Sequence, residues 1–120
     1  MFLNFGHTYA HAIEAEGNFS LYTHGEAVSI GLAGALRLSE RLAGLDTAVS
    51  AKVISLLEAF SLPIHSDGLD PVKVYGALWR DKKALNGQLR WVLIKAPGAP
   101  FTAEAAPLAE VKSALAKIVL

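Results

Sequence analysis

Residues 4–14 carry polar and apolar side chains at the alternating three- and four-residue spacing of an amphipathic α-helix. One face of this helix would present an amide, two imidazoles and a carboxylate, from Asn4, His7, His11 and Glu14. The opposite face is apolar and would present Phe5, Tyr9, Ala12 and Ile13. An ordinary solvated face would use Lys, Arg and Glu, whereas imidazole titrates near neutral pH and binds metals. We therefore expect a helix from Leu3 to Ala15 that packs on a core and offers a functional face.

The composition indicates one globular domain. The chain has 120 residues, of which 52% are hydrophobic, which is enough for a single buried core. The net charge is +0 and there is no basic run, so nothing in the sequence points to nucleic acid. The absence of cysteine excludes disulfides and thiolate metal ligands, and it fits a reducing compartment such as the cytoplasm.

We expect no membrane segment and no secretory signal. The longest apolar stretch, from Ala27 to Leu36, is interrupted by Ser29 and is too short to span a bilayer. Residues 1–3 lack the basic segment with which a secretory signal begins.

A capping box predicts the start of a second helix. Thr23 would be the N-cap, and Glu26 lies three residues later, so the helix should begin at His24 and reach about Ala43. Gly31 and Gly34 lie on its small, apolar face. Glycine lowers helix propensity, so we expect another backbone to approach closely there.

Further helices should follow. Gly44 would end the second helix, and Asp46 would cap a third that reaches about Phe60. Asp70 and Pro71 open a fourth helix, and a last one is expected from Leu108 to Ile118. The apolar residues that should face the core from the third helix are Val49, Val53, Leu56, Leu57 and Phe60.

Apolar residues that alternate with others over residues 88–95 predict a strand, and residues 97–100 should form a loop. No repeat or internal linker is visible. The expected fold is therefore mostly α, a single helical domain over residues 1–120 with one short strand or hairpin.

A third histidine makes a metal site plausible. His24 begins the second helix, a short loop away from the first helix, so it can converge with His7. Zinc commonly binds three protein ligands, neutral imidazoles among them, and keeps a fourth position open for chemistry. His11 could be a third ligand or a neighbouring group. Alternatively, His7 and His11 could cap a partner helix or bond to backbone carbonyls.

Lys82 and Lys83 follow Asp81 at the expected end of the fourth helix. Cations there complement the helix dipole, so a solvated role is one interpretation. The other is an anion site, in which lysine binds phosphate or carboxylate as a point charge. Three other conspicuous side chains are interpreted as structural, namely His65, Trp79 and Trp91.

Three blocks of the chain resemble, in order, the signatures of 3-dehydroquinate synthase: residues 4–14, residues 24–28 (HGEAV) and residues 81–83 (DKK). The first block is long and specific, whereas DKK alone is weak. The resemblance covers essentially all 120 residues and corresponds to the C-terminal helical domain of that family. Ala10 stands where the family usually has glycine, a mild departure at a packed position.

The resemblance implies conversion of 3-deoxy-arabino-heptulosonate 7-phosphate to 3-dehydroquinate and phosphate, in the shikimate pathway that leads to chorismate and the aromatic amino acids. It also implies NAD as a recycled cofactor and a divalent metal, usually zinc or otherwise cobalt. A substrate hydroxyl is oxidised, phosphate is eliminated, the ketone is reduced again, and an intramolecular aldol addition closes the ring.

The same resemblance implies roles for individual residues. By position, His7 and His24 resemble the metal-ligating histidines. Asn4 and His11 resemble catalytic, substrate-contacting residues, with His11 near the phosphate and the proton transfer. One of Lys82 and Lys83 resembles a substrate-contacting lysine, and the choice between them stays open.

Parts of that family's machinery have no counterpart in this sequence. Its N-terminal NAD-binding α/β domain and its third metal ligand, a glutamate, are missing, and no Gly-rich dinucleotide loop is visible. We therefore expect a fragment or half-enzyme that needs an NAD-binding domain in cis or in trans and is inactive alone. The resemblance also makes a homodimer plausible.

Three other interpretations remain. A sister sugar-phosphate cyclase would share the same motifs. An iron-type or glycerol dehydrogenase would share the architecture but not the HGEAV block. A non-catalytic helical interaction module would fit the apolar helix faces, although it would have no need of the histidines and the lysine pair.

Overall fold

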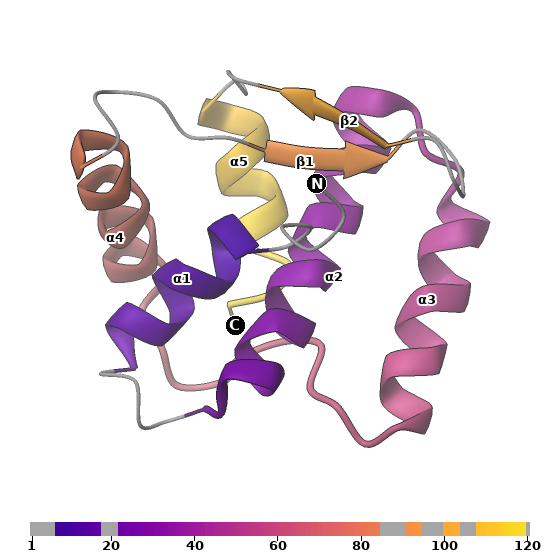
Figure 1. Ribbon diagram of the computed structural model, residues 1–120, viewed down its shortest axis with the longest axis horizontal. Helices are drawn as coiled ribbons and strands as arrows, with labels where there is room; N and C mark the ends of the chain where they lie inside the picture. The colour runs from indigo at the N-terminus through magenta and orange to yellow at the C-terminus, as the bar shows by residue number, and fades with distance from the viewer. Residues whose placement is uncertain (1–6, 18–21, 85–90, 95–99, 104–107, 120) are drawn as a thin grey trace.

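The computed structural model describes residues 7–17, 22–84, 91–94, 100–103 and 108–119. Within these residues the chain forms five helices and one antiparallel hairpin (Figure 1), which confirms the mostly α architecture. The elements are α1 (His7–Glu16), α2 (His24–Ala43), α3 (Thr47–Ala59), α4 (Pro71–Ala84), β1 (Trp91–Ile94), β2 (Pro100–Ala103) and α5 (Leu108–Leu115).

The long helix α2 is the centre of the domain. It contacts α1, α3, α5 and β1, while α1 also packs against α4. In Figure 1, α1 and α4 lie on one side of α2, and α3 lies on the other. None of the helices in the described part of the chain is long and apolar enough to cross a membrane.

The predicted helix boundaries are set by local capping. Thr23 and Glu26 form the expected capping box at the start of α2, and Gly44 ends that helix in the left-handed conformation, at φ 72°. Asp46 Oδ1 accepts a hydrogen bond from the Ala48 N–H over 2.9 Å. Asp70 Oδ1 accepts one from the Val72 N–H, also over 2.9 Å. These side chains satisfy N–H groups that the first helical turn leaves without partners.

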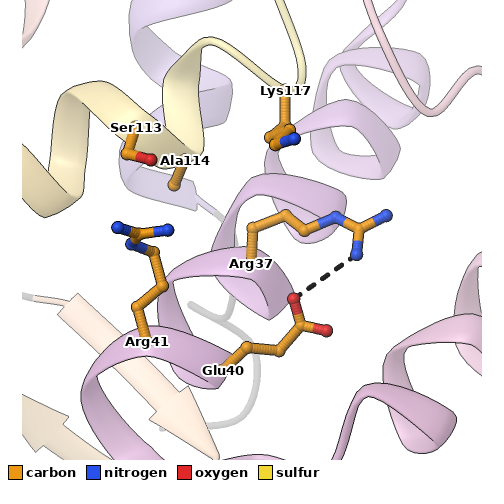
Figure 2. A pocket seen from close by; sticks show the side chains of 6 residues that line it. All are labelled: Arg37, Glu40, Arg41, Ser113, Ala114 and Lys117. Atoms are coloured by element: carbon orange, nitrogen blue, oxygen red, sulfur yellow. Dashed lines mark hydrogen bonds and ion pairs between the residues drawn. The ribbon is translucent and has the colours of Figure 1, made fainter.

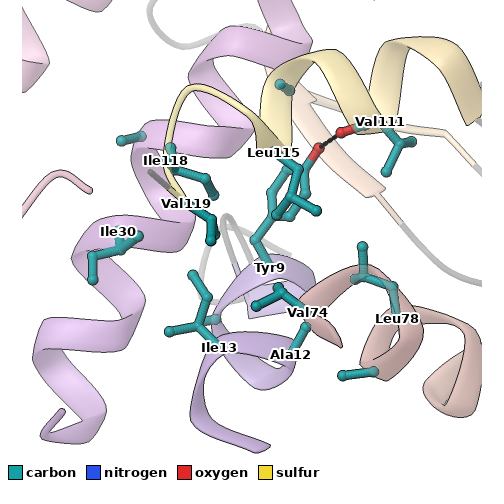
Figure 3. Packing of buried hydrophobic residues seen from close by; sticks show 14 of the residues in the cluster. Tyr9, Ala12, Ile13, Ile30, Val74, Leu78, Val111, Leu115, Ile118 and Val119 are labelled. Carbon is teal, nitrogen blue, oxygen red and sulfur yellow. Dashed lines mark hydrogen bonds between the residues drawn. The ribbon is translucent and has the colours of Figure 1, made fainter. Parts of the chain in front are cut away.

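The main core lies between α1, α2, α4 and α5 (Figure 3). Its large buried hydrophobic side chains come from all four helices and from the turn after α5, and they include Tyr9, Ile13, Ile30, Leu38, Val74, Leu78, Leu115, Ile118 and Val119. The apolar face predicted for α1 is therefore buried where the structure describes it. This packing holds α1, which carries His7 and His11, firmly against α2.

Gly34 accommodates side chains rather than a backbone, so the expected backbone approach is wrong at this position. A Cβ atom at Gly34 would lie 2.7 Å from Ile118 Cδ1 and 2.7 Å from Tyr9 Cδ2. The missing side chain thus makes room for an aromatic ring and a branched chain. Sequence spacing shows that a small residue is needed but does not identify the neighbour.

The predicted inner face of α3 is only partly correct. Leu56 and Phe60 are 57% and 70% exposed, whereas Ser50 and Ile54 are the buried residues of this helix. Ile54 packs with Leu36 and Leu45 in a separate small cluster. The buried face differs from the predicted one because α3 makes its main contacts with a single helix, α2.

The C-terminal part confirms the hairpin and changes two predicted boundaries, at Pro100 and at the end of the last helix. Residues 91–94 of the predicted strand form β1, in which Trp91 pairs with Ala103 and Ile94 with Pro100, while the other residues of the predicted strand lie outside the described part of the chain. Pro100, predicted as the end of a loop, is therefore the first residue of β2. Helix α5 ends at Leu115 rather than at Ile118, although Ile118 is buried as expected. The following segment is held by the Ser66 N–H, which donates to the Ile118 carbonyl over 2.6 Å.

Candidate metal and substrate site

His24 is held at the first position of α2 by the capping box. Thr23 Oγ1 accepts a hydrogen bond from the Glu26 N–H over 3.1 Å, and the Thr23 N–H donates to Glu26 Oε1 over 2.9 Å. This reciprocal pair fixes the backbone on both sides of His24. The His24 side chain is 64% exposed, so a ligand from solvent can reach it.

The carboxylate of Glu14 contacts the imidazole of His24. His24 Nδ1 lies 3.2 Å from Glu14 Oε1 and 3.3 Å from Oε2, so one ring nitrogen faces both oxygens. The Glu14 side chain is only 12% exposed. A sheltered carboxylate of α1 therefore meets an exposed imidazole of α2.

The histidines of α1 share the side of the helix that carries Glu14. His7 is the first residue of α1, and His11 is exposed one turn before Glu14. Helical spacing places positions 7, 11 and 14 on one face. The side chain of His7 lies outside the described part of the structure, as does the whole of Asn4, so their predicted roles stay predictions.

The lysine pair lies on a helix that packs beside α1. Lys82 and Lys83 belong to the last turn of α4, and their side chains are outside the described part of the structure. Arg80, shortly before them, places its Nη2 atom 3.6 Å from Glu16 Oε2 at the end of α1. The Arg80 guanidinium also lies beside Gly76, so the end of α1 meets the middle of α4.

Sequence reasoning missed two contacts. It placed Glu14 on the polar face but gave it no partner, and it did not single out the pair of Glu16 and Arg80. Helical periodicity shows which residues share a face, but it does not show which residue of another helix they meet. Within the described residues there is no group of three or more histidine, cysteine or acidic side chains that could hold a metal.

The structure also has a charged cavity far from His24 (Figure 2). It has a volume of about 300 Å³ and lies between α2 and the end of α5, lined by Arg37, Glu40, Arg41, Ser113, Ala114 and Lys117. Arg37 Nη1 lies 3.4 Å from Glu40 Oε1, and Arg41 pairs with Glu110. Arg37 is thirteen residues beyond His24, which is about 20 Å along the helix. The cavity is therefore separate from the candidate site.

Comparison with known proteins identifies the family. A model of the family described as 3-dehydroquinate synthase C-terminal matches residues 1–84. This chain belongs to the 3-dehydroquinate synthase C-terminal family. The match includes both histidine blocks and the lysine pair, so the resemblance noted in the sequence is confirmed.

Curated 3-dehydroquinate synthases align with most of this chain. The protein of Dehalococcoides mccartyi (strain ATCC BAA-2266 / KCTC 15142 / 195) is 41% identical over 113 residues, which is 94% of this chain. That of Leptospira interrogans serogroup Icterohaemorrhagiae serovar copenhageni (strain Fiocruz L1-130) is 43% identical over 99 residues, or 82% of this chain. The chain spans 31% and 27% of the lengths of these two synthases.

Solved structures of two synthases share the fold of this chain. ValA, a 2-epi-5-epi-valiolone synthase from Streptomyces hygroscopicus subsp. jinggangensis 5008 with NAD⁺ and Zn²⁺ bound, has a TM-score of 0.82 at 24% identity. It covers 95% of this chain, which spans 31% of ValA. A 2-deoxy-scyllo-inosose synthase complexed with carbaglucose-6-phosphate, NAD⁺ and Co²⁺ has a TM-score of 0.72 at 23% identity, with coverages of 95% and 34%. These likenesses establish the architecture.

Proposed function

We propose that this chain supplies the metal- and substrate-binding part of a 3-dehydroquinate synthase, which converts 3-deoxy-arabino-heptulosonate 7-phosphate to 3-dehydroquinate and phosphate. The observation that carries the proposal is the meeting of two sequence blocks, in which Glu14 of the first touches His24 of the second. The 41% identity to a curated synthase over 94% of the chain supports the same activity. The product would enter the shikimate pathway to chorismate, and the absence of cysteine suits a cytoplasmic enzyme.

The residues proposed to hold a divalent metal are His7 and His24. The donor chemistry fits, because His24 is exposed at a fixed helix start and its ring is oriented by a carboxylate. Zinc is the first choice, with cobalt as an alternative, since imidazole suits both. A bound zinc ion would supply Lewis-acid polarisation of the substrate hydroxyl and of the ketone formed from it.

The proposed substrate contacts are Asn4, His11, and Lys82 or Lys83. His11 is exposed on the face shared with Glu14, so its imidazole can exchange a proton with a bound sugar phosphate. An ammonium group at the end of α4 would neutralise a carboxylate or a departing phosphate. These roles rest on the family motif and on the positions of the helices.

We further propose that an NAD-binding domain works with this chain, in cis or in trans, and that the resulting enzyme is a homodimer, by resemblance to its family. NAD accepts and returns the hydride when it is bound. The relatives are about three times as long, since the chain spans 31% of the Dehalococcoides synthase. The 120 residues alone should therefore give no turnover.

Zinc binding by the purified chain is the first test. Metal analysis would compare the wild type with His7→Ala and His24→Ala, and His65→Ala is the matched control because His65 is an exposed loop residue 3.7 Å from Asp67. The proposal expects zinc to be lost in the first two variants only. Equal zinc content in all four proteins would overturn the proposed metal ligands.

Complementation is the second test. The chain would be mixed with the part of the Dehalococcoides synthase that it does not cover, with NAD and zinc present, and phosphate release from 3-deoxy-arabino-heptulosonate 7-phosphate would be measured. We expect release only from the mixture, and loss of release with His24→Ala. Release from glucose 6-phosphate instead would favour a sister cyclase, the alternative that the fold of 2-deoxy-scyllo-inosose synthase suggests.

A further inference from the structure

We propose that Glu14 is a positioning residue for His24, which fixes the imidazole with its Nδ1 atom protonated and its Nε2 atom as the metal donor. This inference rests on the proposed function, because it assigns a role toward the metal of the same site. The metal-ligand positions come from the family, whereas the role of Glu14 comes from its contact with His24.

The first step is the choice of ring nitrogen. A carboxylate oxygen accepts hydrogen bonds and does not donate them. Because both oxygens of Glu14 lie within 3.3 Å of His24 Nδ1, that nitrogen must carry the proton. In a neutral imidazole the lone pair then resides on Nε2, and a metal can bind only there.

The second step is the rigidity of the carboxylate. Glu14 follows Ile13, which is completely buried in the main core, and its own side chain is 12% exposed. The backbone of His24 is fixed separately by the capping box of Thr23 and Glu26. The backbone of His24 is therefore held by the capped start of α2, and its ring is held by the contact with Glu14 of α1.

The third step is selectivity among neighbouring carboxylates. Glu26 accepts from the Thr23 N–H as part of the capping box. Glu16 lies 3.6 Å from Arg80, on the side of α4. Among these three carboxylates of the described residues, Glu14 is the one that contacts His24, and it can be removed without breaking the helix cap.

Such a carboxylate orients a metal-binding histidine and raises its basicity. Removing it commonly lowers metal affinity by about 10- to 100-fold, even though the metal ligand itself remains. The expected effect of Glu14→Ala on zinc affinity is therefore a loss of this size. Glu14→Gln keeps an oxygen that can accept from Nδ1, so it should retain most of the affinity.

The first readout needs no metal. Nitrogen-15 NMR of the metal-free chain at about pH 8, where an ordinary imidazole is neutral, reports which nitrogen of His24 carries the proton. We expect the Nδ1–H form in the wild type and a shift toward the Nε2–H form in Glu14→Ala. A wild-type ring in the Nε2–H form, or no change in the variant, would overturn the proposal.

The second readout is zinc affinity, measured by competition with a chromogenic chelator for the wild type, Glu14→Ala, Glu14→Gln and Glu16→Ala. Glu16→Ala removes a carboxylate from the same helix and should match the wild type within twofold. If Glu14→Gln loses as much affinity as Glu14→Ala, Glu14 binds the metal directly and the positioning role is wrong.

The two proposals fail separately. If zinc affinity is lost in His24→Ala and unchanged in Glu14→Ala, the positioning role fails while the metal site stands. If the tautomer shifts in Glu14→Ala but zinc affinity is the same in His24→Ala and the wild type, the contact stands and the proposed metal ligand fails.

Discussion

The hydroxyl of Tyr9 donates a hydrogen bond over 2.9 Å to the backbone carbonyl of Val111, and so joins the first helix of the domain to the last (Figure 3). Tyr9 is completely buried, and its ring edge faces Gly34 of α2. One side chain therefore connects three helices, and it lies between His7 and His11 in the sequence. The position of the site helix depends on this contact.

Tyr9→Phe should destabilise the chain without changing its fold. It leaves the carbonyl of Val111 without this buried donor, which costs about 1–3 kcal/mol. Urea unfolding followed by circular dichroism would measure the loss. Tyr75→Phe is the control, because it also removes a hydroxyl. It keeps the ring, whose centroid lies 4.8 Å from Lys112 Nζ. Equal stabilities of the wild type and Tyr9→Phe would show that the hydrogen bond contributes nothing.

Stability should fall at alkaline pH because of the same residue. Burial raises the pKa of Tyr9 well above its ordinary value. The unfolded chain therefore releases this proton first, near pH 10, and the folded state loses up to about 1.4 kcal/mol per pH unit above that. Unfolding free energies from pH 9 to 11.5 would show a steeper decline for the wild type than for Tyr9→Phe. Parallel declines would mean that other groups account for it.

Gly34→Ala should be more damaging than an ordinary helical substitution. Its Cβ atom would meet Ile118 Cδ1 and Tyr9 Cδ2 at 2.7 Å, and overpacking of a core costs about 1–3 kcal/mol. Gly25→Ala is the matched control in α2, because nothing lies within 4 Å of its new atom. There the gain in helix propensity should leave stability unchanged or raise it by up to about 1 kcal/mol. If Gly34→Ala leaves the free energy of unfolding unchanged, Tyr9 and Ile118 can move aside at little cost.

The features predicted correctly from the sequence are those that depend on residues close together in the chain, such as helix caps and helical periodicity. Thr23, Asp46 and Asp70 cap their helices as expected, because an N-cap needs only one side chain and the N–H groups two or three residues later. The buried face of α1 was predicted because a helical period is a local property. The family was identified because the first block is long and specific and the two shorter blocks follow it in order.

Contacts between distant elements could not be predicted in the same way. The face that α3 buries depends on how the helix lies on α2, so Leu56 and Phe60 were placed inside although they are exposed. Glu14 was recognised as polar, but its contact with His24 depends on the approach of two helices. The partners of Gly34 come from α1 and from the C-terminal segment, which no local pattern reveals.

Thr23→Ala should weaken both the fold and the metal site. The Thr23 hydroxyl accepts from the Glu26 N–H over 3.1 Å, and removal of such a cap costs about 0.5–2 kcal/mol. His24 is the next residue, so fraying of the first turn should also lower zinc affinity. Thermal unfolding and chelator competition would measure the two effects. Thr23→Ser keeps the hydroxyl and should retain both the stability and the zinc affinity of the wild type. If it loses them as Thr23→Ala does, the cap is not the cause of the two losses.

Substitutions on α3 would test which of its faces supports this domain. Ile54 packs against Leu36 and Leu45, so Ile54→Ala should cost about 2–5 kcal/mol through lost contacts and the cavity left behind. Phe60 is 70% exposed, so Phe60→Ser should change the unfolding free energy by less than about 0.5 kcal/mol. Urea titrations of both variants would separate the two faces. A large loss in Phe60→Ser with little change in Ile54→Ala would restore the face predicted from the apolar spacing and would mean that α3 lies differently on α2.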